Sequence, residues 1–439
     1  MRKKRNAFTL IELLAVIVIL AVILVIAIPR ILDVIETSKK DSFKNAAQLI
    51  ADSAEKKKVS DKLLGKDEEI TCKDVAKIND EDYASCKISF DSEGNAKVSI
   101  TGKGKFDGLK ITNGTKENAE VIEITKPTYG MKATEYITNL LEYDGEGLKI
   151  DNTPDQNIRY YGSNPNNYVL FNNDLWRIIG VFGSNVKLIR NEKLGNLSWD
   201  SSESSINRGY GVNEWSQADL KNYLNTMYYE GTSVTCYNEK NNQTTTCPAN
   251  KLDETSKSLI DNHTWNIGAI DKTDTTIVNP ETFAINTVSF YKAERGTTNG
   301  KICNGRDACN DTVTRTTEWT GYIGLPYPTD YAYASSESDC ETNMNAGDID
   351  FDNGIFNMTC KKNNWMHHGT TMEIEDATWF MSPVADPDYA ANVWYVLGGG
   401  LTNDSCAAYP FSAFPTIYLK SNIIIESGKG TSSDPYILK

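Results

Sequence analysis

The chain opens with an unbroken run of apolar positions. Residues 8–28 read FTLIELLAVIVILAVILVIAI and contain one charged side chain, Glu12. A helix of this length spans roughly 30 Å, which is the thickness of the hydrocarbon core of a bilayer. The preceding residues 2–5 are all basic, whereas the charges after the run are mixed. Because basic flanks stay in the cytoplasm, we expect a single-pass protein of the cytoplasmic membrane with its C-terminus outside.

Helical spacing continues beyond the apolar run. The apolar positions recur every three or four residues: Phe43, Ala46, Ala47, Ile50 and Ala54. The opposite face is charged, with Lys39, Lys40, Lys44 and Asp52. This pattern predicts one helix over residues 8–57 whose second half is buried along one face. A free amphipathic linker is the alternative.

The pattern then changes to period two. Residues 87–90 and 96–100 alternate on either side of a glycine-containing turn, which indicates a β-hairpin. Further strands are predicted at 106–111 and 119–124, so residues 58–126 form a small antiparallel sheet domain. Residues 127–158 contain a short helix, at 129–143, and a polar linker. Residues 159–439 alternate short strands, such as one at 168–171, with a few helices, such as one at 217–228, and form a large mixed α+β domain.

Charge and cysteine content limit which ligands and crosslinks the chain can be expected to have. The 439 residues include 45 basic and 59 acidic side chains, a net charge of −14, so the surface repels phosphate and nucleic-acid binding by charge is excluded. Three histidines and no C-x-x-C pair argue against zinc. Of nine cysteines, eight form neighbouring couples that suit local disulfides in an oxidising compartment: Cys72 and Cys86, Cys236 and Cys247, Cys303 and Cys309, Cys340 and Cys360. Cys406 is left over, and buried free thiols are the alternative.

The N-terminal string KKRNAFTLIELLAVIVILAVILVIAIP resembles the prepilin N-terminus of type IV pilins and type II secretion pseudopilins. The shared features are the basic leader, a small residue before Phe8, Glu12 four residues later, the apolar run and Pro29. Ala7 departs from the glycine that is usual in the family. The resemblance implies that residues 1–7 are a leader, that prepilin peptidase cuts between Ala7 and Phe8, and that its methyltransferase activity methylates Phe8.

Cleavage also gives the acid in the apolar run a partner. It creates an α-amino cation at the edge of the run, and in a filament this cation can pair with Glu12 of a neighbouring subunit. A desolvated pair of this kind is worth far more than a surface bridge. The alternative is that Glu12 extends to the lipid headgroups.

The C-terminal blocks NNYVLFNNDLWRIIGVF, WSQADLKNYLN, WFMSP and PTIYLKS resemble large domains behind prepilin leaders in some bacterial surface proteins. Their order of strand, helix and tryptophan-bearing loop is also similar to C-type-lectin-like and sulfatase-modifying-factor-like folds. The expected fold class is therefore α+β: a long N-terminal transmembrane helix, a small antiparallel pilin sheet and a large lectin-like domain at 159–439.

Two ligand sites can be suggested in this large domain. Asp348, Asp350 and Asp352 alternate before a glycine and could bind calcium, although the spacing is not that of an EF-hand and we favour a solvated acidic turn. Calcium is the only cofactor that the sequence suggests. Trp199, Trp215 and Trp365 stand in polar loops and could stack on a surface glycan, whereas core packing is the commoner role of tryptophan.

Enzymatic chemistry is not expected. His367 and His368 could exchange protons and Cys406 could be a nucleophile, but no G-x-S-x-G or H-E-x-x-H motif is present. The sequence therefore predicts a minor type IV pilin-like subunit that assembles with other pilin subunits into a surface filament and presents a head for adhesion to a glycan or protein. The alternatives are a pseudopilin of a secretion or DNA-uptake system, a plain membrane-anchored surface protein and a membrane-tethered enzyme.

Overall fold

The structure is a computed structural model that describes residues 10–66, 69–76, 81–143, 145–202, 210–239, 243–296, 313, 315–350, 355–368, 377–385 and 391–439. The chain divides into two compact units. The first comprises Met1–Lys126 with Glu142–Asp144, and the second comprises Pro127–Leu141 with Gly145–Lys439.

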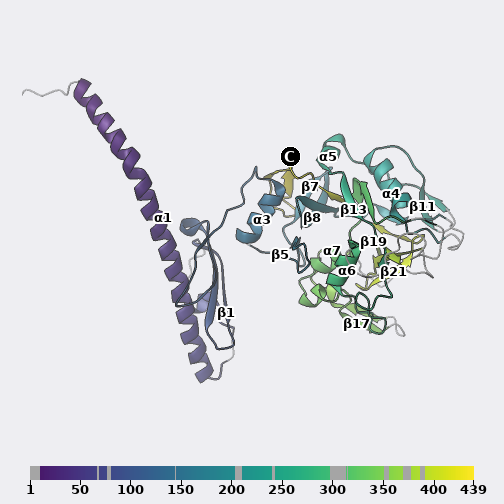
Figure 1. Cartoon of the computed structure of the whole chain (residues 1–439), viewed down its shortest axis with the longest axis horizontal. Coiled ribbons are helices and arrows are strands. Elements are labelled where there is room, and N and C mark those ends of the chain that lie inside the picture. The colour runs from purple at the N-terminus through teal and green to yellow at the C-terminus, as the bar shows by residue number, and fades with distance from the viewer. Residues whose placement is uncertain are drawn as a thin grey trace, which may run out of the picture. The chain divides into compact units, whose positions relative to one another are not determined.

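The first unit is built on helix α1, Leu10–Leu63. Figure 1 shows the second half of this helix lying along a small sheet, while the first half continues beyond the sheet. The side chains that face the sheet are fully or almost fully buried: Phe43, Ala47, Ile50, Ala51 and Ala54. The expected apolar face is thus confirmed, except that Ala46 is half-buried and Ala51 takes a place on that face. On the side of α1 that faces away from the sheet, residues four positions apart form salt bridges, such as Lys56 with Asp52 at 2.6 Å.

The sheet of the first unit is antiparallel and follows chain order: β1 (Tyr83–Phe90), β2 (Ala96–Gly102), β3 (Leu109–Gly114) and β4 (Ile122–Glu123). The predicted hairpin is confirmed. In its turn the Asp91 carboxylate accepts hydrogen bonds from the amides of Glu93 and Asn95, at 3.0 and 2.9 Å. The third strand begins later than expected because Gly104–Phe106 form a 3₁₀ turn, η1, which turns the Phe106 ring toward Phe43 with 5.2 Å between ring centroids.

A disulfide joins Cys72, at the start of the short helix α2 (Cys72–Val75), to Cys86 on β1. The second unit contains two more of the expected disulfides, Cys236–Cys247 and Cys340–Cys360. Cys303 and Cys309 lie outside the described residues. Cys406 is unpaired and half-buried.

The second unit contains, within its described residues, one large sheet with nine strands. Its central path runs β16 (Ile323–Gly324), β23 (Thr416–Tyr418), β9 (Asn185–Arg190), β8 (Asp174–Phe182), β7 (Tyr168–Phe171), β25 (Tyr436–Leu438) and β24 (Ile425–Ser427). Strand β6 (Ile158–Tyr160) pairs with β8, and β5 (Leu148–Ile150) pairs with β6. Only the contact of β25 with β7 is parallel among these pairs.

A second sheet has six strands in the described part of the chain. Its path is β10 (Gly195–Ser198), β22 (Pro410–Ala413), β19 (Thr378–Ala385), β20 (Asn392–Val396) and β21 (Thr402–Cys406), with β14 (Ile270–Asp271) alongside β19. Three two-stranded ribbons are added: β11 (Cys236–Glu239) with β12 (Gln243–Thr245), β13 (His263–Asn266) with β15 (Glu318–Gly321), and β17 (Gly347–Asp350) with β18 (Ile355–Met358).

The helices of the second unit are short (Figure 1). They are α3 (Ala133–Tyr143), α4 (Asp219–Asn222), α5 (Glu254–Leu259), α6 (Thr287–Glu294) and α7 (Pro328–Ala334), with 3₁₀ turns η2 (Trp215–Gln217), η4 (Ser338–Glu341) and η5 (Thr359–Lys361) and the π-helical turn η3 (Tyr223–Tyr229). The helix expected over 217–228 is therefore divided between α4 and η3. One hydrophobic core joins both sheets and these helices, which confirms a mixed α+β unit with largely antiparallel sheets.

In the part of the chain that the structure describes, no helix combines the length and the apolar character that a membrane crossing requires. Residues 8 and 9 of the expected transmembrane segment, and several side chains after them, lie outside the described part.

Candidate functional site

The first half of α1 presents its apolar side chains to the surroundings. We call residues 10–35 of this helix the exposed arm. Twelve large apolar side chains on it have exposed fractions of 47–77%: Ile11, Leu13, Leu14, Val16, Ile17, Val18, Ile19, Ile28, Ile31, Leu32, Val34 and Ile35. Consecutive positions such as 16–19 point in different directions around a helix, so the apolar surface surrounds the arm. A helix that is apolar on all sides requires either lipid or the helices of other proteins around it.

The base of the exposed arm is held to the small sheet by two lysines. The Lys39 ammonium donates to the carbonyl oxygen of Asp107 at 2.6 Å. Lys40 donates to the carboxylate of Glu123 on β4 and lies 3.3 Å from that of Glu36. The hydrogen bond to Glu123 is the main cause of the raised pKa of Lys40. The arm therefore projects from a fixed base rather than from a loop.

The residues predicted for processing and assembly belong to this end of the chain. Ala7 and Phe8 lie outside the described residues. Glu12 lies on α1, but its side chain is not among those described. Cleavage after Ala7, methylation of Phe8 and the pairing of Glu12 consequently stay predictions.

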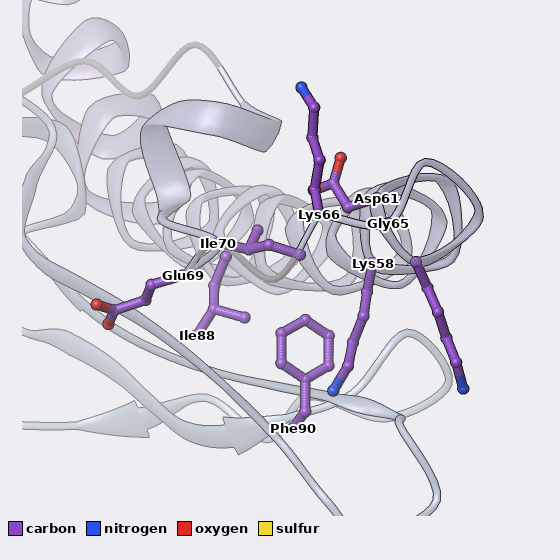
Figure 2. A pocket seen from close by; sticks show the side chains of 9 residues that line it. Lys58, Asp61, Gly65, Lys66, Glu69, Ile70, Ile88 and Phe90 are labelled. Atoms are coloured by element: carbon purple, nitrogen blue, oxygen red, sulfur yellow. The ribbon is translucent and has the colours of Figure 1, made fainter.

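A hollow of about 640 Å³ lies at the opposite end of α1 (Figure 2). Ile70, Ile88 and Phe90 supply apolar surface on one side, and the other lining residues are Lys58, Asp61, Lys62, Gly65, Lys66 and Glu69. The Lys58 ammonium stands 3.8 Å from the centroid of the Phe90 ring, a cation–π contact. These lining residues include no nucleophile with an adjacent base, so the hollow suits electrostatic contact rather than a reaction.

The structure corrects the expected glycan-stacking tryptophans. Trp199 and Trp215 have no exposed surface, and Trp365 is 4% exposed. Their rings belong to the hydrophobic core, where the Trp199 and Trp365 indoles donate to the carbonyl oxygens of Phe380 and Tyr160. The prediction that these three form a stacking surface is wrong, because segments distant in sequence pack around the three rings in the core.

Two of the predicted calcium ligands lie on a two-stranded ribbon. Asp348 and Asp350 are on β17, opposite Asn357 and Ile355 on β18. Asp352 lies outside the described residues, so the calcium site stays a prediction. Among the residues that the structure describes, no group of three or more histidine, cysteine or carboxylate side chains is placed to hold a metal ion.

The candidate acid–base and nucleophilic groups of the large domain are His367, His368 and Cys406, and each of them contacts other side chains or is largely buried. His367 is 3.0 Å from the Tyr331 hydroxyl, and the His368 ring stacks on Phe414 at 4.4 Å. Burial lowers the pKa of His368 to about 4, so its ring is neutral at physiological pH. Burial, followed by the charge of Asp404, raises the pKa of the Cys406 thiol, which makes it a poor nucleophile.

A buried ionic cluster in the second unit was not foreseen. Asp330 of α7 contacts the Lys187 ammonium at 2.5 Å and the Arg159 guanidinium at 2.6 Å, and Arg159 also binds Asp151 at 2.8 Å. All four side chains are at most 3% exposed. Glu294 is buried nearby and accepts a hydrogen bond from the Thr329 hydroxyl at 2.8 Å. The sequence signal was a lysine at the centre of the apolar strand NVKLIR, whose acidic partner lies 143 residues away.

Burial shifts the pKa values of the charged groups in this cluster. Burial lowers the pKa of Lys187 to about 8, despite the opposing effect of Asp330. Burial alone would raise the pKa of Asp330, but Lys187 and Arg159 outweigh it and lower this pKa. Burial raises the pKa of Glu294 to about 7. Water-free surroundings thus bring an amine close to its neutral form beside a carboxyl group.

The second unit also contains a cavity of about 470 Å³ beside β21. Ile285, Trp394 and Leu401 form buried parts of its wall, and Phe283 is 41% exposed. The Trp394 indole nitrogen and the Thr402 hydroxyl are buried without a hydrogen-bond partner in the described part of the chain. Phe283 has φ +55°, a strained conformation for a bulky residue. Apolar walls with unpaired polar groups are typical of a small-ligand site.

Comparison with known proteins identifies the N-terminal segment. Residues 2–28 match the prokaryotic N-terminal methylation motif, which is the leader signature of type IV pilins. This confirms the resemblance drawn from that segment and supports a type IV pilin-like or pseudopilin-type precursor. No curated protein and no solved structure matches the chain, so the lectin-like fold of the large domain stays a prediction.

Proposed function

We propose that this protein is a minor type IV pilin-like subunit that assembles through its exposed arm and carries a large extracellular head. One observation carries the proposal. The methylation motif at residues 2–28 overlaps the exposed arm over residues 10–28, and the helix then packs on a four-stranded antiparallel sheet. An apolar helix end on a compact sheet base is a shape that can be packed side by side in a filament core.

The apolar surface supports an order of events. Before assembly the arm and its leader are held in the cytoplasmic membrane, where the apolar side chains are solvated by lipid. Prepilin peptidase removes residues 1–7, and the new amino group of Phe8 becomes a cation. In the filament, arms of several subunits bury one another, and Glu12 pairs with this cation on a neighbouring subunit.

Substitution of Glu12 tests assembly. Glu12→Val should leave the protein in the membrane fraction and remove it from sheared surface filaments, because the cation of the neighbour loses its partner. The matched control is Glu36→Val, the same change in the same helix but outside residues 2–28. Equal amounts of Glu12→Val and wild-type protein in sheared filaments would contradict the proposal.

The size of the head supports a minor role, and we propose surface contact as its function. The second unit has about 300 residues, which are difficult to place on every subunit of a dense helical fibre. Its 470 Å³ cavity is our candidate for the contact site with a surface glycan or protein.

Phe283→Ala, a change in the wall of this cavity, should weaken the attachment of cells that make the filament without changing filament number. Unchanged attachment would exclude the cavity from adhesion.

A pseudopilin of a type II secretion or DNA-uptake system is the second candidate, because the same methylation motif serves such machines. A deletion strain separates the two functions. Loss of attachment with normal secretion and DNA uptake supports the filament subunit, whereas loss of secretion or uptake with normal attachment supports the pseudopilin. A membrane-tethered enzyme would retain its leader.

A further inference from the structure

The strongest unexplained feature of the second unit is the contact between Lys187 of β9 and Asp330 of α7. Lysine side chains are almost never fully buried unless they are paired, yet Lys187 has no exposed surface. Its ammonium lies 4.3 Å from the Tyr327 ring centroid and 5.3 Å from those of Phe182 and Tyr418. The aromatic rings exclude water from the nitrogen on several sides.

From these contacts we infer that Lys187 and Asp330 become covalently joined by an amide bond between Nζ of the lysine and Cγ of the aspartate. The two groups stand 2.5 Å apart between nitrogen and oxygen, in a buried site. Holding two reactants in this way replaces a bimolecular collision by an intramolecular step, which is equivalent to a very high local concentration. The modification is autocatalytic and requires no cofactor.

The atoms balance without an added reagent. One proton passes from the ammonium to the Oδ2 atom of Asp330 along their contact, which leaves an amine and a carboxylic acid. The amine attacks Cγ and the C–N bond forms, while the C–Oδ2 bond breaks. Oδ2 departs as water with two protons, both of which come from the original ammonium. The product nitrogen keeps one hydrogen, as an amide requires.

The surroundings favour the attack of the neutral amine and the charge that this attack develops. Desolvation activates a lysine as a nucleophile, in agreement with its lowered pKa of about 8. The Arg159 guanidinium is 2.6 Å from Oδ1 of Asp330, where negative charge develops when the amine attacks. Lys187 and Arg159 lower the pKa of Asp330, so the carboxylic acid that the attack requires is a minor species, formed when the lysine transfers its proton.

The amide also suits the buried site better than the ion pair does. Two charges held out of water become one neutral group, while Arg159 keeps its contact with Asp151 at 2.8 Å. The amide of Tyr327, which donates to Oδ2 at 3.0 Å, loses this acceptor. One capping hydrogen bond is thereby lost, whereas the burial of two charges is avoided. The bond connects the large sheet to α7 across 143 residues of sequence and would resist mechanical extension of the head.

Mass spectrometry of the full-length protein, extracted from its native membrane and reduced, tests the inference. An amide at Lys187 blocks trypsin there, so residues 178–190 should appear joined to residues 316–361, at the summed peptide mass less one water. Lys187→Arg keeps the charge but forms no such amide, and it should give only separate peptides. Recovery of wild-type peptide 178–187 cleaved after Lys187, with no joined species, would overturn the inference. The result does not depend on filament assembly, so this inference and the proposed function fail separately.

Discussion

Single residues in this chain take their properties from burial more than from their type. Lys187, Asp330 and Glu294 are charged residues by sequence, but each is almost without solvent contact. The tryptophans show the same effect, since Trp199 and Trp215 stand in polar sequence and lie in the core. The apolar neighbours of Lys187 in NVKLIR indicate its burial, but its acidic partner and the segments that cover the tryptophans come from distant parts of the chain.

The buried carboxyl of Glu294 predicts a pH dependence of stability. Burial raises its pKa from 4.5 to about 7 in the folded protein. Its contribution to the free energy of unfolding is therefore full below pH 4.5 and declines as the pH rises through 7, by an amount on the order of 3 kcal/mol. Glu294→Gln should remove this decline.

Urea unfolding monitored by tryptophan fluorescence at pH 4.5 and pH 8 measures this effect. All eight tryptophans lie in the second unit, so the signal reports the unit that contains Glu294. Other titrating groups are common to both proteins and cancel in the difference. If wild type and variant show parallel pH profiles, the carboxyl is not buried as described.

Secondary-structure elements could be predicted wherever their pattern is local. The hairpin of β1 and β2 follows from alternation around a glycine turn, and β7 begins and ends where the pattern predicts. The second half of α1 follows from its 3–4 spacing. The division of 217–228 into α4 and η3 could not be predicted, because the same apolar spacing suits either helical winding. The exposed arm was predictable as an apolar helix, whereas the ionic cluster depends on pairing across 143 residues.

Docking of α1 on the small sheet depends on Phe43. This ring is fully buried against Phe106 and Tyr83. Phe43→Ala should destabilise the first unit by about 3–5 kcal/mol, because it leaves a cavity in a small core. Leu49→Ala, on the outer face of the same helix where Leu49 is 67% exposed, should have little effect. Hydrogen exchange of amides 43–54 measures the difference, and equal exchange in both variants would show that the helix is not docked through this face.

The disulfide between Cys72 and Cys86 should stabilise the same unit. It joins residues 14 positions apart. Loss of a crosslink that closes a loop of this length lowers the free energy of unfolding by about 3 kcal/mol. Replacement of both cysteines by serine should therefore make strand β1 sensitive to protease at neutral pH. Cys406→Ser, which removes an unpaired thiol, is the control and should change nothing in this region. Protease resistance equal to wild type would mean that the bridge is dispensable.

At the scale of the whole molecule, the two roles that we propose fall in two compact units. The first unit combines the methylation motif, the exposed arm and a small sheet, on which the proposed assembly depends. The second unit holds the tryptophan-rich core, the 470 Å³ cavity and the ionic cluster. The proposed roles in assembly and in surface contact therefore lie in different units, each of which has a hydrophobic core of its own.

The most direct measurement is the mass of the N-terminal peptide of the protein isolated from its native cell. Our account predicts that this peptide begins at Phe8 and carries one additional methyl group on its amino nitrogen. A peptide that begins at Met1 or Arg2 would show that the leader is retained, and the protein would then be a tethered surface protein rather than a filament subunit.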